Sequence, residues 1–160
     1  MAAAQGQQEY LQAAVELARN GRAGTLATAA DGQPHAALVT FAYLPDGAPL
    51  LLLSNLSAHT RQLRRNPACC LLVTGAPNGD NPQTTPRLAL SGRAAVTQDP
   101  AARAGFLAAH PYAAQYADFA DFQYWRLDLS EVQFVGGFAA AFRLNAVAVQ
   151  QGIIAAERNA

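Results

Sequence analysis

Short apolar segments separated by turn residues fill most of this chain, and they restrict the fold more than any other feature of the sequence. Asp31-Gly32 joins two such segments, "AGTLATAA" and "HAALVTFAY", and is typical of a tight hairpin turn. "LPDGAP" precedes a third segment, "LLLLSN", whose unbroken apolar run predicts a strand buried on both faces. Further strands are predicted in "ACCLLVTG", in "RLALSGRAAVTQ" with a bend at Gly92, in "FQYWRLDL" and in "EVQFVGGF".

Helical patterns lie before, between and after these strands. An amphipathic spacing of apolar residues predicts a first helix that stops near Gly21. Pro67 disfavours helical geometry at the residue before it, so a second helix is expected to end there. Asp99 is read as the N-cap of a third helix, with Pro100 at its first position. The predicted helical segments are 7–20, 57–66, 99–111 and 112–118, and the tail from Leu144 is expected to be weakly helical or loosely ordered.

These elements favour one particular fold class. Of the 160 residues, 51% are hydrophobic and 14% are charged, which suits a single domain over residues 1–160 with a large core. Six or seven short strands, with one helix in front and others inserted late, indicate a mainly β antiparallel barrel with peripheral helices. The regular alternation of strand and helix that marks a doubly wound sheet is absent from the sequence.

Charge and hydropathy exclude several classes of function. The formal net charge is zero, which argues against a general nucleic-acid-binding protein. No apolar run approaches the roughly 20 residues that span a bilayer, and no basic segment precedes an apolar one at the start. We therefore expect a cytoplasmic protein that does not contact membranes. All eleven basic residues are arginine, a usage typical of GC-rich bacterial genomes, so an arginine here is not by itself evidence for a phosphate ligand.

Few residues suggest chemistry by the protein alone. Cys69 and Cys70 are neighbours in a predicted strand, point to opposite faces and are interpreted as small apolar residues. No cluster with metal-ligand spacing, no carboxylate pair and no nucleophile with a paired base is visible in the sequence. We therefore predict no metal site and assign no catalytic residue; if the protein is an enzyme, a bound cofactor supplies the chemistry.

The segment "LSNLSAHTRQLRRNP" is the strongest candidate for a binding site. Ser57 is placed to cap the following helix, with its hydroxyl on the amide of His59 or Thr60. The first amides of that helix have no partner within it and can accept a phosphate, with the hydroxyl of Ser54 and the charge of Arg61 nearby. The alternative is that Ser57 only caps the helix and that the arginines are solvated.

Arg87 and Arg93 are a second candidate pair of cations. They lie six residues apart in the predicted fifth strand, and this even spacing places both on one face. Either one of them contacts an anion across a dimer interface, or both are surface arginines. His110, which precedes Pro111 at the end of a predicted helix, is interpreted as structural.

A family resemblance emerges when four passages are taken together. They are "GTLATAADGQPHAALVTFAY", "LLLLSNLSAHTRQLRRNPACCLLV", "TPRLALSGRA" and "ADFADFQYWRLDLSEVQFVGGFAAAF". The first two resemble the FMN-binding split-barrel family of the pyridoxamine 5'-phosphate oxidases, and the last two resemble its haem-utilisation branch. The similarity runs from Gly24 to Phe142. It implies a six-stranded antiparallel split barrel that forms a homodimer, with two cofactor sites built from both subunits at the interface.

The resemblance also implies a set of FMN-binding residues. The phosphate would lie near hydroxyl and amide groups, near the His-Thr pair of the branch and near one arginine, and the isoalloxazine edge would lie along the second strand. These residues are Ser54, Asn55, Ser57, His59, Thr60 and Arg61 for the phosphate, and Leu38, Val39 and Thr40 for the ring.

The chain departs from the phosphate oxidases at several cationic positions. Ala36 and Phe41 stand near the arginine and lysine of the family's second strand, and Ala58 and His59 replace the Arg-Lys pair at the helix start. FMN would then be held by helix amides and Arg61, and oxidation of pyridoxine phosphate is not expected.

The resulting expectation is an FMN-binding flavoprotein, an oxidoreductase acting on a small-molecule substrate that the sequence does not identify. Two alternatives stay open. The first is a haem-binding, haem-utilisation or haem-degrading protein, although the haem-utilisation relatives add a C-terminal segment for haem handling and the tail here contains no histidine. The second is a split barrel without a cofactor that acts as a dimeric binding module.

Overall fold

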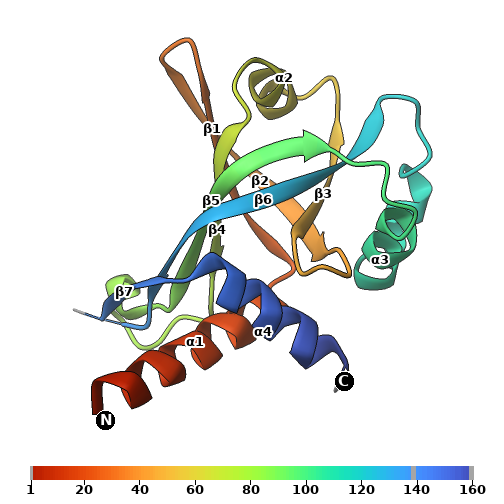
Figure 1. Cartoon of the computed structure of the whole chain (residues 1–160). Coiled ribbons are helices and arrows are strands. Elements are labelled where there is room, and N and C mark those ends of the chain that lie inside the picture. Colours follow the sequence, from red (N-terminus) through yellow and green to blue (C-terminus); the bar gives the residue numbers. More distant parts are fainter. Residues whose placement is uncertain (1, 138–139, 159–160) are drawn as a thin grey trace.

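Six antiparallel strands close into a barrel in the computed structural model, which describes residues 2–137 and 140–158 (Figure 1). Neighbouring strands pair in the order β3-β2-β1-β4-β5-β6, and a further pairing of β3 with β6 closes the ring. The strands are β1 (Ala23–Ala30), β2 (Gln33–Tyr43), β3 (Pro49–Ser54), β4 (Ala68–Thr74), β5 (Arg87–Val96) and β6 (Phe122–Val135). The expected six-stranded antiparallel split barrel is therefore confirmed.

The hairpin between β1 and β2 has the predicted two-residue turn. Asp31 and Gly32 have φ angles of 50° and 73°, and Ala30 pairs directly with Gln33 across the turn. Two successive residues with positive φ are the mark of the turn whose twist matches that of the flanking strands. Asp-Gly is a favoured pair for this conformation, so the sequence signal and the geometry agree.

Strand β3 is buried on both faces, as its run of four leucines predicts. Leu51 and Leu53 point into the barrel and belong to its interior cluster. Leu50 and Leu52 point outward and pack with Phe106 in a second cluster beneath α3 (Ala102–Ala109). The same strand is hydrogen-bonded to β2 on one side and to β6 on the other. It is therefore enclosed on all four sides.

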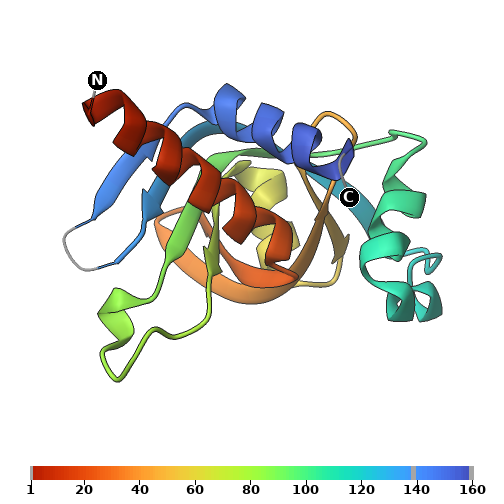
Figure 2. The same cartoon turned by 90° about the horizontal axis from the view of Figure 1, so that it is seen from below.

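The helices cover the two ends and one side of the barrel. The long helices α1 (Ala2–Asn20) and α4 (Ala146–Arg158) cross one end side by side, as Figures 1 and 2 both show. Val15 of α1 and Ile153 of α4 are buried in the same cluster as the barrel interior. The short helix α2 (Ala58–Arg65) lies at the opposite end, and α3 lies beside β3. No helix within the described ranges has the length and apolar character needed to cross a membrane.

Strand β6 corrects one prediction. The segments "FQYWRLDL" and "EVQFVGGF" form one strand of 14 residues rather than two. The pairing with β5 skips Ser130, because Ser91 opposes Glu131 while Gly92 opposes Leu129. A β-bulge thus absorbs the polar residue that looked like a break between strands. Phe138, the last residue of the second segment, lies outside the described residues.

Smaller differences occur at other boundaries. Helix α3 begins at Ala102 instead of Pro100, because the carboxylate of Asp99 accepts the amide of Ala101 and the chain makes one more turn first. Strand β7 (Ala141–Leu144) was not predicted and pairs with the end of β6, and α4 is a regular helix rather than a loose tail. The remaining elements are the short 3-10 helices η1 (Pro82–Thr84) and η2 (Pro111–Gln115), the latter where a helix over 112–118 was expected.

Candidate functional site

A cavity of about 350 Å³ lies where β3 passes into α2, and we call it the β3–α2 cavity. Six of the predicted site residues line it, so the structure brings together two separate parts of the sequence: Leu38, Val39, Thr40, Ser54, Ser57 and His59. Four further residues complete the wall and were not predicted: Leu52, Leu53, Tyr116 and Phe122.

The walls of the β3–α2 cavity are mostly apolar. The rings of Tyr116 and Phe122 lie 5.1 Å apart and form one side. The side chain of Leu38 is 80% exposed although it is large and apolar. The cavity therefore combines an aromatic and aliphatic lining with an open mouth.

The turn after β3 is fixed by hydrogen bonds to the residue before β6. The hydroxyl of Ser54 donates to the carboxylate of Asp121 at 2.5 Å and accepts the amide of Leu56 at 3.1 Å. The amide of Asn55 donates to the Asp121 carbonyl oxygen at 2.7 Å. Ser54 thus stabilises the turn through its side chain.

Ser57 occupies the predicted N-cap position of α2, but its side chain does not cap the helix. Its backbone is extended, with φ −75° and ψ 146°, and its hydroxyl makes no capping hydrogen bond. The amides of Ala58, His59 and Thr60 have no hydrogen-bond partner within the part of the chain that the structure describes. Free amides at a helix N-terminus attract anions. The expected capping bond is therefore wrong, while the expected set of free amides is present.

His59 is half-buried at the polar end of the cavity. Its pKa is lowered from the ordinary value of 6.5, first by burial and then by His35, whose ring centroid lies 6.4 Å away. Near pH 7 the imidazole is therefore held in its neutral form. A neutral imidazole nitrogen is a ligand for transition metals.

Three other predicted residues point elsewhere. The hydroxyl of Thr60 is buried without a partner, and Arg61 donates to the carbonyl oxygen of Leu56. The side-chain oxygen of Asn55 accepts from Arg64 at 2.7 Å. Arg64 also donates to Gln123 at 2.6 Å. None of these side chains is among those that line the cavity.

Arg87 and Arg93 lie on one face of β5, as their spacing predicts, but at opposite ends of the strand. Arg87 is opposite Thr74 in β4 and Arg93 is opposite Ala68, so roughly 20 Å of strand separates them. Arg87 donates to the carbonyl oxygens of Gln83 and Thr85 at 3.0 and 3.1 Å. The structure does not bring either arginine to the lining of the β3–α2 cavity.

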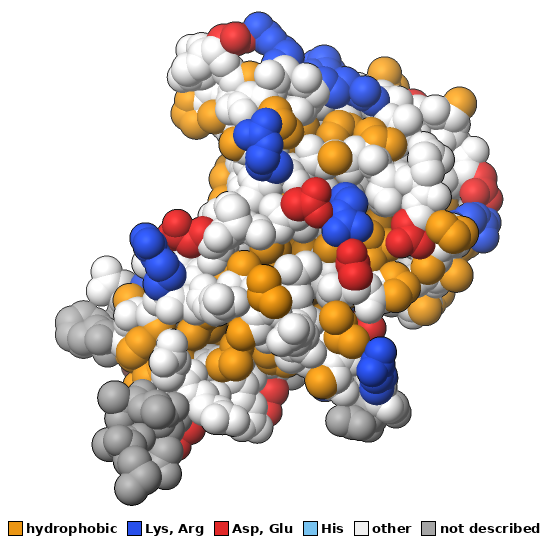
Figure 3. Space-filling model, in the orientation of Figure 1, with side chains coloured by type: hydrophobic (Ala, Val, Ile, Leu, Met, Phe, Trp, Pro, Cys, Tyr) orange, Lys and Arg blue, Asp and Glu red, His pale blue; other side chains and the backbone are white. Residues whose placement is uncertain are grey.

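The electrostatic character of the cavity follows from its lining. Arginine side chains gather over α2 at the top of Figure 3, and lower on that face they alternate with acidic side chains. Of the described residues that line the cavity, none is an arginine. Within residues 2–137 and 140–158, no group of three His, Cys, Asp or Glu side chains is arranged to hold a metal ion. The cavity can hold an apolar body with a weakly anionic end next to a neutral imidazole.

The residues that sequence reasoning missed come from two places. Leu52 and Leu53 directly precede Ser54, so their position in the third strand was a usable signal. Tyr116 and Phe122 lie more than 50 residues further along the chain. Phe122 is opposite Ser54 in the β3–β6 pairing, and the ring of Tyr116 packs against that of Phe122. Only the barrel closure places them there.

Comparison with known proteins gives one matching family model and several similar proteins. The family model described as pyridoxamine 5'-phosphate oxidase matches residues 11–136. The chloroplastic non-canonical heme oxygenase HOZ of Arabidopsis thaliana is 36% identical over 125 residues, which are 76% of this chain and 38% of that protein. A heme binding protein from Mycobacterium smegmatis has a similar structure, with a TM-score of 0.80 and 30% identity over 91% of this chain and 60% of that one. This chain therefore spans less than two thirds of either protein.

A more distant structure supports the fold alone. HutZ, the heme storage protein from Vibrio cholerae, aligns with a TM-score of 0.60 and 20% identity over 73% of this chain and 88% of that one. The two chains share the split-barrel fold.

Proposed function

The chain belongs to the pyridoxamine 5'-phosphate oxidase family, and within that family we propose that it binds haem in the β3–α2 cavity. Two relatives at 30% identity or more carry haem in their names, one as a heme oxygenase and one as a heme binding protein. The structural observation that carries the proposal is the half-buried His59 at the polar end of a mostly apolar cavity.

The residues of the cavity suit the three parts of a haem. Leu52, Leu53 and Phe122 provide apolar contact for the macrocycle. His59 would hold the iron through a ring nitrogen, since neutral imidazole is the commonest metal ligand in proteins. The free amides at the start of α2 suit carboxylates such as the propionates. A bound haem would supply the iron and oxygen chemistry, and the chain would hold, orient and shield it.

FMN is the second candidate, and the same free amides favour it. A phosphate binds well at a helix N-terminus, and the hydroxyl of Ser57 lines the cavity without a capping role. Two features weigh against it. No arginine is among the described lining residues, and Arg61 bonds to the turn carbonyl of Leu56. A phosphate dianion is harder to neutralise here than a carboxylate, so haem is the better match.

The first experiment titrates the purified chain with haemin and, separately, with FMN. We expect a Soret band that shifts and saturates with haemin, and no saturable change in flavin fluorescence. Replacing the iron ligand (His59→Ala) should weaken haemin binding ten-fold or more, equivalent to about 1.4 kcal/mol. His35→Ala is the matched control, because His35 lies beside His59 and is not among the residues that line the cavity.

Other outcomes of the titration would replace the proposal. Saturable flavin binding without a haem spectrum would assign the cavity to FMN. No binding of either compound by folded protein would favour a split barrel without a cofactor that acts as a dimeric binding module. A loss of haemin binding in His35→Ala alone would move the iron ligand to His35.

We also propose that two copies of the chain pair over this cavity. Leu38, Leu56 and Phe119 are 80%, 76% and 57% exposed, and each lies in or next to a segment that contributes to the cavity wall. Large apolar side chains exposed together mark an interaction surface. A second copy would cover them and enclose the open side of a planar ligand.

The pairing is tested by the mass of the protein in solution. Light scattering after gel filtration should give twice the mass of one chain. Leu38→Glu should shift the protein to a monomer and weaken haemin binding, because the charge would be placed in the covered surface. Val147→Glu on α4 is the control, since Val147 is 60% exposed and does not line the cavity. A monomeric parent protein would refute the pairing.

A further inference from the structure

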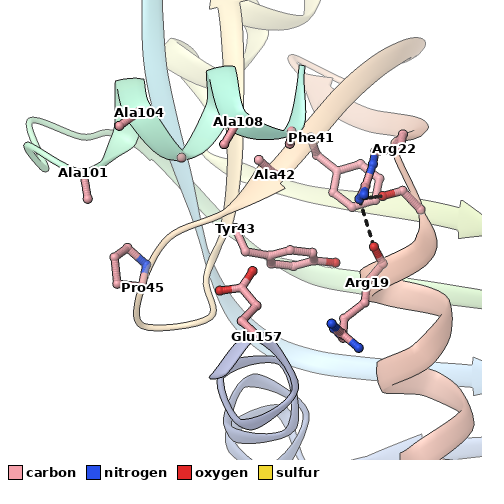
Figure 4. Close-up of a pocket in the computed structure, with 13 residues that line it drawn as sticks. Arg19, Arg22, Phe41, Ala42, Tyr43, Pro45, Ala101, Ala104, Ala108 and Glu157 are labelled. Carbon is pink, nitrogen blue, oxygen red and sulfur yellow. Dashed lines mark hydrogen bonds between the residues drawn. The ribbon is translucent and has the colours of Figure 1, made fainter. Parts of the chain in front are cut away.

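A second cavity, of about 520 Å³, lies where the end of α1, the end of β2, α3 and the last turn of α4 meet (Figure 4). We call it the α1–α3 cavity. It shares no lining residue with the β3–α2 cavity, so the two are separate sites. Its volume falls within the ordinary range for small-molecule pockets, about 300–1,000 Å³.

Small side chains on α3 leave this cavity open. Ala101, Ala104, Gly105 and Ala108 line it, and a Cβ added at Gly105 would meet only the carbonyl oxygen of Tyr43, at 3.6 Å. That distance is an ordinary contact, so close packing does not require glycine there. Tyr43 lies on the opposite side, and Phe41 lines the cavity beside it although its side chain is only 1% exposed. A ligand body between these walls would be in apolar contact on both sides.

Two arginines stand at the edge of the cavity. Arg22 donates one nitrogen to the carbonyl oxygen of Arg19 at 2.9 Å, which leaves other donors of its guanidinium unused. Arg19 is half-buried, and its guanidinium has no ion pair or hydrogen bond to any residue the structure describes. Figure 4 shows both arginines at the α1 end of the cavity, with Tyr43 and Glu157 below α3.

Glu157 is the one acidic residue among those that line the cavity, and it pairs with neither arginine within 4.0 Å. Burial, and then the Glu157 carboxylate, raise the pKa of the Tyr43 phenol, while Arg22 lowers it. The phenol itself donates to the carbonyl oxygen of Ala18 at 3.1 Å. The lining therefore carries a net charge of one positive unit and no internal ion pair.

We propose that the α1–α3 cavity binds a small organic monoanion with an apolar aromatic body. The carboxylate or sulfonate of such a ligand would be held by Arg19 and Arg22, and its rings would lie between the alanines of α3 and Tyr43. Glu157 disfavours a second negative charge. The site is thus selective for one charge as well as for shape.

The test uses two probes of the same ring system. 8-Anilinonaphthalene-1-sulfonate carries one negative charge, and N-phenyl-1-naphthylamine carries none. Fluorescence titration of the full chain should give a dissociation constant at least ten-fold lower for the sulfonate. In Arg19→Gln, the ratio of the dissociation constants of the neutral probe and the sulfonate should fall toward one, and it should fall further in the double variant with Arg22→Gln. Binding of the neutral probe should stay unchanged in both variants.

A second pair of variants fixes the location. Ala108→Leu fills the cavity from an exposed helix position and should weaken binding of both probes ten-fold. Ala114→Leu adds the same bulk at an exposed position of η2 outside the cavity and should bind both as the parent does. Arg143→Gln on β7 is the control for charge. Parent-like sulfonate binding in Ala108→Leu, or an undiminished preference in the double arginine variant, would overturn the proposal.

Discussion

His59 is the residue whose protonation state matters most for the proposed function. Its folded-state pKa lies below 6.5 because burial, and then His35, disfavour the charged form. The unfolded chain therefore takes up this proton more readily than the folded chain does. Above pH 6.5 the group has no effect, and stability is lost as the pH falls from 6.5 through the lowered pKa.

The prediction for His59 is a titration midpoint below 6.5 in the ligand-free protein. Nuclear magnetic resonance of the imidazole signals, assigned with His59→Gln, measures it. Haemin binding should weaken over the same pH interval, because a protonated imidazole offers no free electron pair to iron. A midpoint at or above 6.5 would contradict the assignment of a half-buried, neutral imidazole.

At the scale of single residues, the sequence predicted well which residues lie near the β3–α2 cavity. It predicted less well which of their side chains point into it. The hydroxyl-rich turn and the 38–40 segment converge because neighbouring strands β2 and β3 carry them. Arg61 was expected beside the phosphate, but its guanidinium bonds to the carbonyl oxygen of Leu56. Long side chains on a short helix have several partners within reach, and sequence spacing does not choose among them.

At the scale of the elements, the bulged pair β5–β6 requires one particular residue type at one position. A Cβ at Gly92 would stand 2.0 Å from the carbonyl oxygen of Asp128, a backbone atom that cannot move aside alone. The bulge at Ser130 brings the two strands this close. Glycine is therefore required at position 92 by the approach of the neighbouring strand.

We predict that Gly92→Ala destabilises the fold by about 1–3 kcal/mol, the usual cost of an overpacked site. Chemical denaturation followed by tryptophan fluorescence measures the loss, since Trp125 is buried within the barrel. Gly105→Ala is the matched control, because its Cβ would make only one ordinary contact and alanine favours the helix by about 0.5–1 kcal/mol. Equal losses in the two variants would show that the bulge tolerates a side chain.

Two features with strong local signals were predicted correctly, and two elements that are defined by pairing were not. The β1–β2 hairpin and the end of α2 before Pro67 depend on turn and proline chemistry that short segments carry. The single long β6 and the four-residue β7 depend on partners elsewhere in the chain. The polar Ser130 suggests a break between two strands in the sequence, and only its pairing with β5 identifies it as a bulge.

For the whole molecule, the first and last helices complete the core. Val15 and Ile153 are buried in the cluster that also contains the barrel interior, although they are far apart in the sequence. The barrel itself closes through pairs such as Leu51 with Trp125. These contacts are non-local, and no local pattern specifies them.

Truncating Ile153 to alanine should cost about 2–5 kcal/mol, as expected for a large apolar side chain removed from a packed core. Val147→Ala, on the same helix but 60% exposed, should change stability by less than about 0.5 kcal/mol. Thermal and urea unfolding of both variants measure the loss in the free energy of unfolding. Similar values for the two would mean that α4 is only loosely attached to the barrel.

Strand β3 is hydrogen-bonded to a strand along each edge, and apolar side chains pack against both of its faces. Its last residue, Ser54, begins the turn beside the β3–α2 cavity, and Asp121 accepts two hydrogen bonds from that turn. A ligand bound there would contact residues of this enclosed strand and would stabilise the folded chain. Occupancy at a hundred times the dissociation constant would add about 2.7 kcal/mol against unfolding. A simple melting-temperature screen of tetrapyrroles and flavins could therefore rank candidate occupants side by side.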